Sequence, residues 1–355
     1  MPTSPDHGAR LAAQVTQLVA AAELVILQRI RDRLAAGIDA PTWAVNKLAE
    51  LQALREAVAG DLGALDDDLA AAVADVIDQA YGLGRSEAAA DVPGAAVPAF
   101  VPAAVRRLAE DVLTKVIGAR PTVLRATADA YREVVARATA PVLLGASTRV
   151  QAAQAALDDL LARGITGFRD AAGRRWTLES YVEMATRTGA GRAAVLGHLD
   201  GLTEQGHDLV YPIPGPRACA SCDEQAGKVL SISGATTSVL VDGRLVEVTS
   251  WREATADGHL FGPNCRCSVG AYFPGITTPN VERPDPAGYA AGQEQRRLER
   301  GVREWKRREQ LALTPEAGRA ARAKVRQWQG RLRDHLAAHP DLRRAPRREQ
   351  IGRAR

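Results

Sequence analysis

Apolar residues in the first part of the chain recur at helical spacing. The first series is Leu11, Val15, Leu18, Ala22 and Val25. These alternating steps of four and three residues predict a helix with a narrow apolar seam. Gly37 marks its end, Pro41 opens the next helix, and helical periodicity continues past a proline-rich interruption at 91–102. Because alanine-rich helices have thin side chains, they depend on packing against partners, so we expect a bundle or an extended helical arm over 1–163.

The pattern changes to short alternating runs after Asp208. Val239-Leu240-Val241 and Leu245-Val246 flank Asp242-Gly243, which is the sequence of a hairpin with a two-residue turn. A helix precedes these strands, and Thr177 is placed to cap its N-terminus. Residues 164–280 are therefore predicted to form a central α+β module with a small antiparallel sheet.

Helical periodicity returns in the last part of the chain. Leu298, Val302 and Trp305 share one face of a helix. Thr314-Pro315 combines an N-cap with proline at the first helical position, which opens a second helix. We expect residues 281–355 to form a basic amphipathic helical hairpin whose arginine-rich end, beyond Pro340, is frayed. The predicted fold class is α+β and predominantly helical, in three parts.

The composition is that of a globular chain. Of the 355 residues, 46% are hydrophobic and 25% are charged, which argues against disorder. Residues 1–14 carry charged side chains and no apolar run, so no secretory signal is visible. The best candidate for a membrane segment, Leu18–Ile30, contains Glu23 and Gln28 and is too short to span a bilayer. We therefore predict a soluble protein without membrane contact.

The positive charge of the chain is concentrated in its last part. The formal net charge is +4, but residues 281–355 carry about twenty Lys/Arg against about ten Asp/Glu, a balance near +10, which leaves roughly −6 elsewhere. A stripe on the first helix of the tail consists of Arg296, Arg300, Arg303 and Arg307. These arginines are candidates for contact with nucleic acid or another polyanion. The alternative is a solvated face on a docked helix.

All four cysteines fall in one short stretch, as Cys219-x-x-Cys222 and Cys265-x-Cys267, with His259 just upstream of the second pair. A Cys-x-x-Cys turn lets two thiolates converge on one ion, and a second pair from a distant loop completes a tetrahedron. On a straight strand Cys265 and Cys267 would point to opposite faces. Both can therefore bind one metal only if the turn at 262–264 bends the backbone; otherwise His259 replaces Cys267.

A structural zinc site is our main interpretation of this cluster, because four protein ligands leave no open position for catalysis. Two alternatives stay open: disulfides or opportunistic thiols, and reduced cysteines packed as small apolar residues.

No enzyme signature is visible, and we assign no catalytic residue. The nucleophile elbow, the phosphate-binding loop and the dinucleotide-binding fingerprint are absent from the sequence. No glutamate follows His259 at the deaminase spacing. His259 and Asn264 would suit a metal-dependent nuclease or a delivered toxin, but no second histidine lies nearby to hold a catalytic metal. A simple nucleic-acid-binding module is a further alternative.

Several motifs in the second half of the chain resemble those of a known family. They are Gly164-Ile165-Thr166-Gly167-Phe168, Tyr181-Val182-Glu183-Met184-Ala185, Cys219-Ala220-Ser221-Cys222, Phe261-Gly262-Pro263-Asn264-Cys265-Arg266-Cys267 and Arg303-Glu304-Trp305-Lys306-Arg307. From about Gly164 to Gln329 the chain resembles the phage minor capsid protein 2 family, which is related to the Mu F-like head morphogenesis proteins of tailed phages. Where this chain has Cys267, the family commonly has histidine; both are zinc ligands.

The resemblance implies a non-enzymatic structural protein of the virion, present in few copies. It implies association with the portal vertex and with DNA packaging or delivery, after assembly in the bacterial host cytoplasm. The expected partners are the portal and major capsid proteins and, through the basic tail, packaged DNA. In this scheme residues 1–163 are a docking arm.

Overall fold

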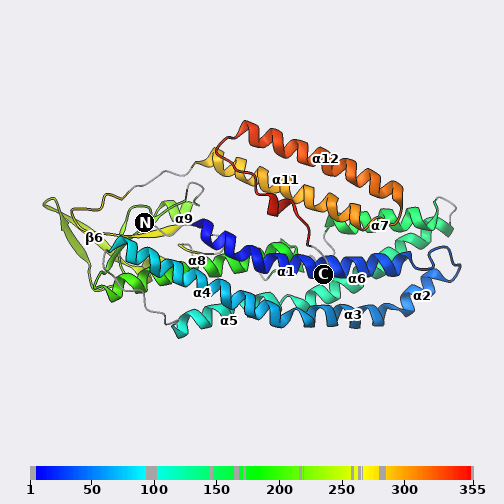
Figure 1. Ribbon diagram of the computed structural model, residues 1–355, viewed down its shortest axis with the longest axis horizontal. Coiled ribbons are helices and arrows are strands. Elements are labelled where there is room, and N and C mark those ends of the chain that lie inside the picture. The colour runs from blue at the N-terminus through cyan, green and yellow to red at the C-terminus, as the bar shows by residue number, and fades with distance from the viewer. Residues whose placement is uncertain are drawn as a thin grey trace. The chain divides into compact units, whose positions relative to one another are not determined.

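The computed structural model describes residues 5–92, 102–143, 147–163, 168–170, 173–215, 218, 220–256, 260–262, 265, 267–279 and 285–352 (Figure 1). Helices dominate the fold and accompany one small sheet, which confirms the predicted α+β class. The long helices are α1 (Pro5–Ala35), α3 (Leu51–Ala64), α4 (Asp66–Asp91), α5 (Ala103–Ile117), α6 (Arg120–Leu143), α7 (Arg149–Arg163), α8 (Leu178–Glu204), α11 (Pro286–Gln310) and α12 (Pro315–Ala338). The shorter ones are α2 (Trp43–Ala49), α9 (Ala220–Asp223), α10 (Trp251–Thr255) and the 3₁₀ helix η1 (Pro346–Glu349).

The main sheet has five strands in the order β5-β6-β4-β3-β7. Its strands are β3 (Leu209–Ile213), β4 (Val229–Ser231), β5 (Ser238–Val241), β6 (Arg244–Ser250) and β7 (Ser268–Ala271). The predicted turn joins β5 to β6, with positive φ at both Asp242 and Gly243. The prediction of an antiparallel sheet is wrong in one respect, because the sheet is mixed. The chain reverses direction through β5, so that β6 pairs antiparallel with β5 and parallel with β4. A separate two-stranded pair joins β1 (Phe168–Arg169) to β2 (Arg175–Trp176).

The chain divides into two compact units, each built from three stretches. We call residues 1–15, 69–116 and 182–289 the sheet unit, and residues 16–68, 117–181 and 290–355 the helical unit. These units do not run consecutively along the chain, whereas the segments 1–163, 164–280 and 281–355 do. The three segments stay a prediction about sequence organisation.

The core of the sheet unit lies between one face of the sheet and α8. Val210 of β3 points into it, while its neighbours Leu209 and Tyr211 face a smaller cluster on the other side of the sheet, as alternation along a strand requires. The main cluster consists of Ala88, Val195, Leu199, Leu202, Val210, Cys222, Leu230, Leu260, Phe261, Val269 and Ala271.

Two glycines bring α4 and α8 into backbone contact within this unit. A β-carbon on Gly84 would overlap the carbonyl group of Ala194, and one on Gly197 would overlap the carbonyl group of Tyr81. No other residue type allows so close a crossing, because any side chain would occupy the space that the facing backbone fills.

In the helical unit, α6 packs against α7, α3 and α2. The turn between α1 and α2 is fixed by hydrogen bonds from two buried or half-buried side chains. The indole of Trp43 donates to the carbonyl of Leu34 at 3.0 Å. Arg149 of α7 donates to the carbonyls of Ile38 and Ala40 at 2.7 and 2.8 Å. The loop's carbonyls are thereby satisfied by a distant part of the chain.

A buried ion-pair network joins three segments of the helical unit. Arg307 of α11 pairs with Glu23 of α1 at 3.0 Å and with Glu179 of α8. Arg303, one turn earlier on α11, contacts the other oxygen of Glu179 at 3.3 Å. Glu23 and Glu179 are both almost fully buried, so each depends on these guanidinium groups for its charge. The two carboxylates together raise the pKa of Arg307, although burial opposes this.

The end of the chain is held in place, so the prediction that it frays beyond Pro340 is wrong for the described residues. Glu349 of η1 is 2% exposed and accepts hydrogen bonds from Arg344. Lys306 donates to its carbonyl at 2.7 Å, and Gln295 donates to the carbonyl of Arg343 at 2.9 Å. The many arginines of this segment suggested a solvated end, whereas the buried carboxylate of Glu349 anchors it.

The apolar stretch of α1 is longer than the sequence analysis assumed. Residues 8–35 form a helix long and apolar enough, by length and composition, to cross a membrane, and its most apolar 18-residue window has a mean hydropathy of 1.5. The prediction that this stretch is too short to span a bilayer is therefore wrong for α1. Core helices pass the same test, and α1 buries Val19, Leu24, Ile26 and Ile30 as well as Glu23.

We expect Gly84→Ala to destabilise the sheet unit by about 1–3 kcal/mol or more, because the new methyl group forces α4 and α8 apart. The matched control is Gly82→Ala on the same helix, where a β-carbon would meet no atom within 4 Å. The control should be neutral or stabilising by up to about 1 kcal/mol, because alanine favours the helix. Chemical denaturation of both variants measures the difference; equal stabilities would contradict the close crossing.

Arg307→Ala should destabilise the helical unit by about 3–5 kcal/mol, because it leaves Glu23 and Glu179 buried without their main partner. The control is Arg326→Ala, which removes an exposed arginine from α12 and should change stability by less than about 0.5 kcal/mol. Thermal and urea unfolding report both values. If both variants lost the same free energy of unfolding, the ion-pair network would contribute no more to stability than an exposed arginine.

Candidate metal centre

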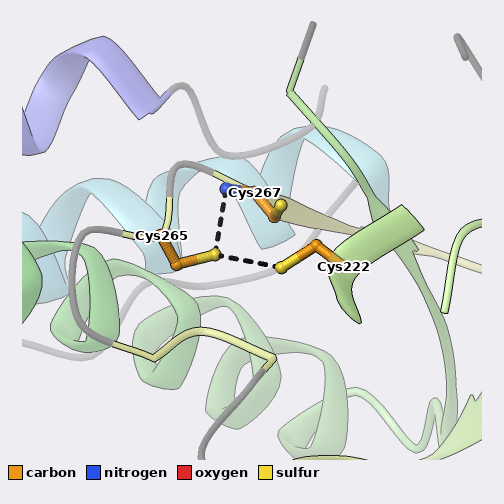
Figure 2. Close-up of side chains that lie close together, drawn as sticks. All are labelled: Cys222, Cys265 and Cys267. Atoms are coloured by element: carbon orange, nitrogen blue, oxygen red, sulfur yellow. Dashed lines mark hydrogen bonds between the residues drawn. The ribbon is translucent and has the colours of Figure 1, made fainter. Parts of the chain in front are cut away.

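Three of the four cysteines meet because of the pairing between two neighbouring strands. β3 and β7 are antiparallel, with Ile213 opposite Ser268. The end of β3 therefore lies beside the start of β7. The chain that leaves β3 carries Cys222 on α9, and the chain that enters β7 carries Cys265 and Cys267. Figure 2 shows the three thiols facing one another from these two loops.

The distances between the sulfurs fit a shared metal ion. The Sγ atoms of Cys222, Cys265 and Cys267 all lie within 4.8 Å of one another. Cys222 Sγ and Cys265 Sγ are 3.6 Å apart, far beyond the disulfide bond length of about 2.05 Å. A tetrahedral zinc with Zn–S bonds of about 2.3 Å separates its sulfur ligands by about 3.8 Å. The three cysteines are free thiols in the arrangement that such an ion requires.

Two hydrogen bonds hold Cys265 close to Gly262 and to Cys267. The amide of Cys265 donates to the carbonyl of Gly262 at 3.0 Å. The amide of Cys267 then donates to Cys265 Sγ at 3.4 Å, drawn in Figure 2. The sulfurs of Cys265 and Cys267 accordingly lie close enough to each other and to Cys222 to reach one metal ion.

Phe261, four residues before Cys265, has a backbone conformation that is unfavourable for any residue except glycine, and contacts in the core stabilise it. Phe261 has φ of 57°, in the left-handed region that favours glycine. Its ring stacks on Trp251 of α10 at 5.3 Å between centroids. Its carbonyl accepts a hydrogen bond from Arg192 of α8 at 3.2 Å. These contacts hold Phe261, and through it the position of Cys265, in place.

The close approach of the three thiols shifts their pKa values in opposite directions. Hydrogen bonds from Cys222 and then from Cys267 lower the pKa of Cys265 to about 3. The hydrogen bond that Cys222 shares with Cys265 raises the pKa of Cys222 in turn. Cys222 is buried, and all three cysteines pack against the main core cluster. The three thiols cannot all ionise side by side without a cation, because the thiolates would repel one another. A divalent cation would stabilise all three thiolates together, and thiolate ligands suit zinc.

The other predicted ligands, Cys219 and His259, lie outside the described residues. The cluster that the structure does describe has three thiol sulfurs that could bind a metal ion, and the metal and its fourth ligand stay a prediction. Arg192, Trp251 and Phe261 are supporting residues that the sequence analysis missed. These roles have no local signal in the sequence. Arg192 and Phe261 are 69 positions apart, and position 261 has a left-handed backbone although its residue is phenylalanine, whereas glycine would have marked such a position.

The four arginines of the predicted stripe on α11 have different surroundings in the structure. Arg303 and Arg307 are directed into the helical unit and pair with Glu179 and Glu23. Arg296 is half-buried, and Arg300 is exposed. Arg303 and Arg307 are therefore not available to a polyanion.

The family assignment rests on nearly the full length of the chain. The family model for phage minor capsid protein 2 matches residues 4–337. No curated protein and no solved structure matches the sequence. The match includes all four cysteines and both tail helices, and it extends through the N-terminal helices, where the sequence resemblance was weakest. The chain belongs to the phage minor capsid protein 2 family, whose members are components of the virion.

Proposed function

We propose that this chain is a non-enzymatic structural protein of a phage head, present in few copies and attached at the portal vertex. It assembles with portal or major capsid proteins in the host cytoplasm and contributes to DNA packaging or delivery. The observation that carries the proposal is the family match over residues 4–337. The basic C-terminal region is the part of the chain that would meet packaged DNA.

An exposed apolar pair on the sheet unit supports docking onto another head protein. Leu240 and Leu245 are opposite each other in the β5–β6 hairpin and are 67% and 74% exposed. Val239, Val241 and Val246, on the other face, pack against the sheet. The hairpin is therefore anchored on one side, and it presents leucines to solvent on the other, as contact sites commonly do.

We further propose that the three-thiol cluster holds a structural zinc ion, with Cys219 or His259 as the fourth ligand. Cys222, Cys265 and Cys267 would bind it as thiolates and so lock the loop after β3 to the loop before β7. The ion would supply folding energy to a sheet whose strands have only three to seven residues. A site closed by four protein ligands supports no reaction.

The first test is metal content. Protein purified under reducing conditions should contain close to one equivalent of zinc by elemental analysis, because a closed structural site stays filled. Cys222→Ser should lose the zinc and unfold the sheet unit at lower denaturant. The control Val269→Ala removes a methyl pair from the same buried cluster and should lower stability while retaining zinc. Less than about a tenth of an equivalent in the wild type would refute the zinc site.

The second test is location in the virion. Mass spectrometry of purified particles should detect the chain at far fewer copies than the major capsid protein, and an asymmetric reconstruction should place it at one vertex. Absence from particles, or even distribution over the shell, would contradict the proposal.

The nuclease alternative predicts plasmid cleavage with divalent metal that His259→Ala abolishes; we expect no cleavage by the wild type.

The hairpin contact is tested within the same particles. Leu240→Ser/Leu245→Ser should fold normally but reduce incorporation into virions, because both side chains are already in solvent. Ile276→Ser, which is 83% exposed elsewhere in the sheet unit, is the matched control. Equal incorporation of both variants would exclude the hairpin as a contact site.

A further inference from the structure

We infer that the outer face of α12 is a binding surface for the phosphate backbone of double-stranded DNA. This inference rests on the proposed function and names the partner of the basic tail. It also moves the contact from α11, where the sequence pattern placed it, to the neighbouring helix.

The arginines of α11 are largely occupied within the protein. Arg303 and Arg307 neutralise buried carboxylates. Lys306 is engaged by the carbonyl of Glu349. Arg308 pairs with Glu304 and lies 4.3 Å from the ring of Trp305. The positive charge of α11 therefore serves mainly to hold the helical unit together.

Four exposed arginines lie in a line along one side of α12, while Arg331, which is also exposed, lies over the ring of Trp328. The four are Arg319, Arg322, Arg326 and Arg333. All four are exposed, and their spacing of three, four and seven residues places them on one side of the helix. The line is about 21 Å long at 1.5 Å per residue. The opposite side of α12 is buried through Ala321, Val325 and Leu332, so the helix is fixed with its arginines outward.

These arginines are available for a ligand. The pairs of Arg319 with Glu316 and of Arg322 with Glu309 leave the arginines 69% and 65% exposed, and such surface pairs contribute little free energy. Among the described residues, neither Arg326 nor Arg333 pairs with a carboxylate. Guanidinium groups recognise phosphate oxygens with two parallel hydrogen bonds.

The composition of this face favours DNA over an acidic protein. The large apolar side chains that are exposed in the described part of the chain are Val45, Leu48, Leu240, Leu245, Ile276 and Tyr289. None of them belongs to α12, whereas the centre of a protein interface is enriched in aromatic and apolar residues. A line of arginines separated by alanine, glycine and glutamine matches a backbone of phosphates instead.

The same face favours duplex over single-stranded DNA. Single-strand binding relies on aromatic rings on which bases stack. The one aromatic residue of α12, Trp328, lies against Gly301 of α11, where a β-carbon would overlap its ring. Arg297 and Arg331 lie 5.4 Å from the same ring. α11 and α12 lie side by side (Figure 1). Because the indole packs between these two helices, α12 presents charge without a stacking platform.

The test compares two variants of the full chain that each lose two positive charges from the helical hairpin. Arg326→Gln/Arg333→Gln removes charge from α12, and Arg296→Gln/Arg300→Gln removes it from α11. The probe is a short mixed-sequence DNA duplex, with affinity measured over a series of salt concentrations. We expect the α12 variant to bind more weakly and its slope of log affinity against log salt to be shallower by about 1.8, since each phosphate contact contributes about 0.9.

The α11 variant should keep the slope of the wild type, and unfolding curves should show that both variants are folded. Equal effects of the two variants, or preference for a single strand of the same sequence, would overturn the inference. Binding by the wild type to polyglutamate but not to duplex would overturn it in favour of an acidic protein partner. None of these outcomes changes whether the chain is found in virions, so the proposed function is tested separately.

Discussion

The antiparallel pairing of β3 with β7 is the constraint on which the candidate metal centre depends. With Ile213 opposite Ser268, the loop that leaves one strand must meet the loop that enters the other. Cys222 and the Cys265–Cys267 pair are far apart in the chain, yet they converge without any further adjustment. Phe261, held by Trp251 and Arg192, fixes the start of the segment that carries Cys265.

This arrangement explains how so small a sheet is stabilised. Its strands are short, and one face shares its core with α8, whose own position is set by backbone contact with α4 at Gly84 and Gly197. The cysteines lie at the edge of that core. A zinc ion there would join the two loops at the point where the hydrophobic cluster ends, so that burial and coordination would support the same few strands.

The arginines of the tail serve two different purposes. On α11 they compensate carboxylates that burial would otherwise leave unpaired, as with Arg307 between Glu23 and Glu179. On α12 they are exposed in a line, while the other side of that helix is packed. Net charge alone does not separate these cases, because a guanidinium contributes equally to the balance whether it is buried beside a carboxylate or faces solvent.

The sequence by itself determined the elements whose causes are local. The hairpin turn at Asp242-Gly243, the cap at Thr314 and the helical conformation of α1 follow from turn chemistry, capping and periodicity, and the family motifs from about Gly164 onward identified the protein's class. The buried face of α1 did not follow, because only Val15 of the predicted seam is buried. Tertiary structure alone decided the rest. The parallel pairing of β4 with β6, the anchoring of Glu349, the left-handed Phe261 and the burial of Arg303 and Arg307 depend on residues brought together from distant segments. Such contacts leave no periodic trace in the chain, because the partner that makes each arrangement favourable is found only after folding.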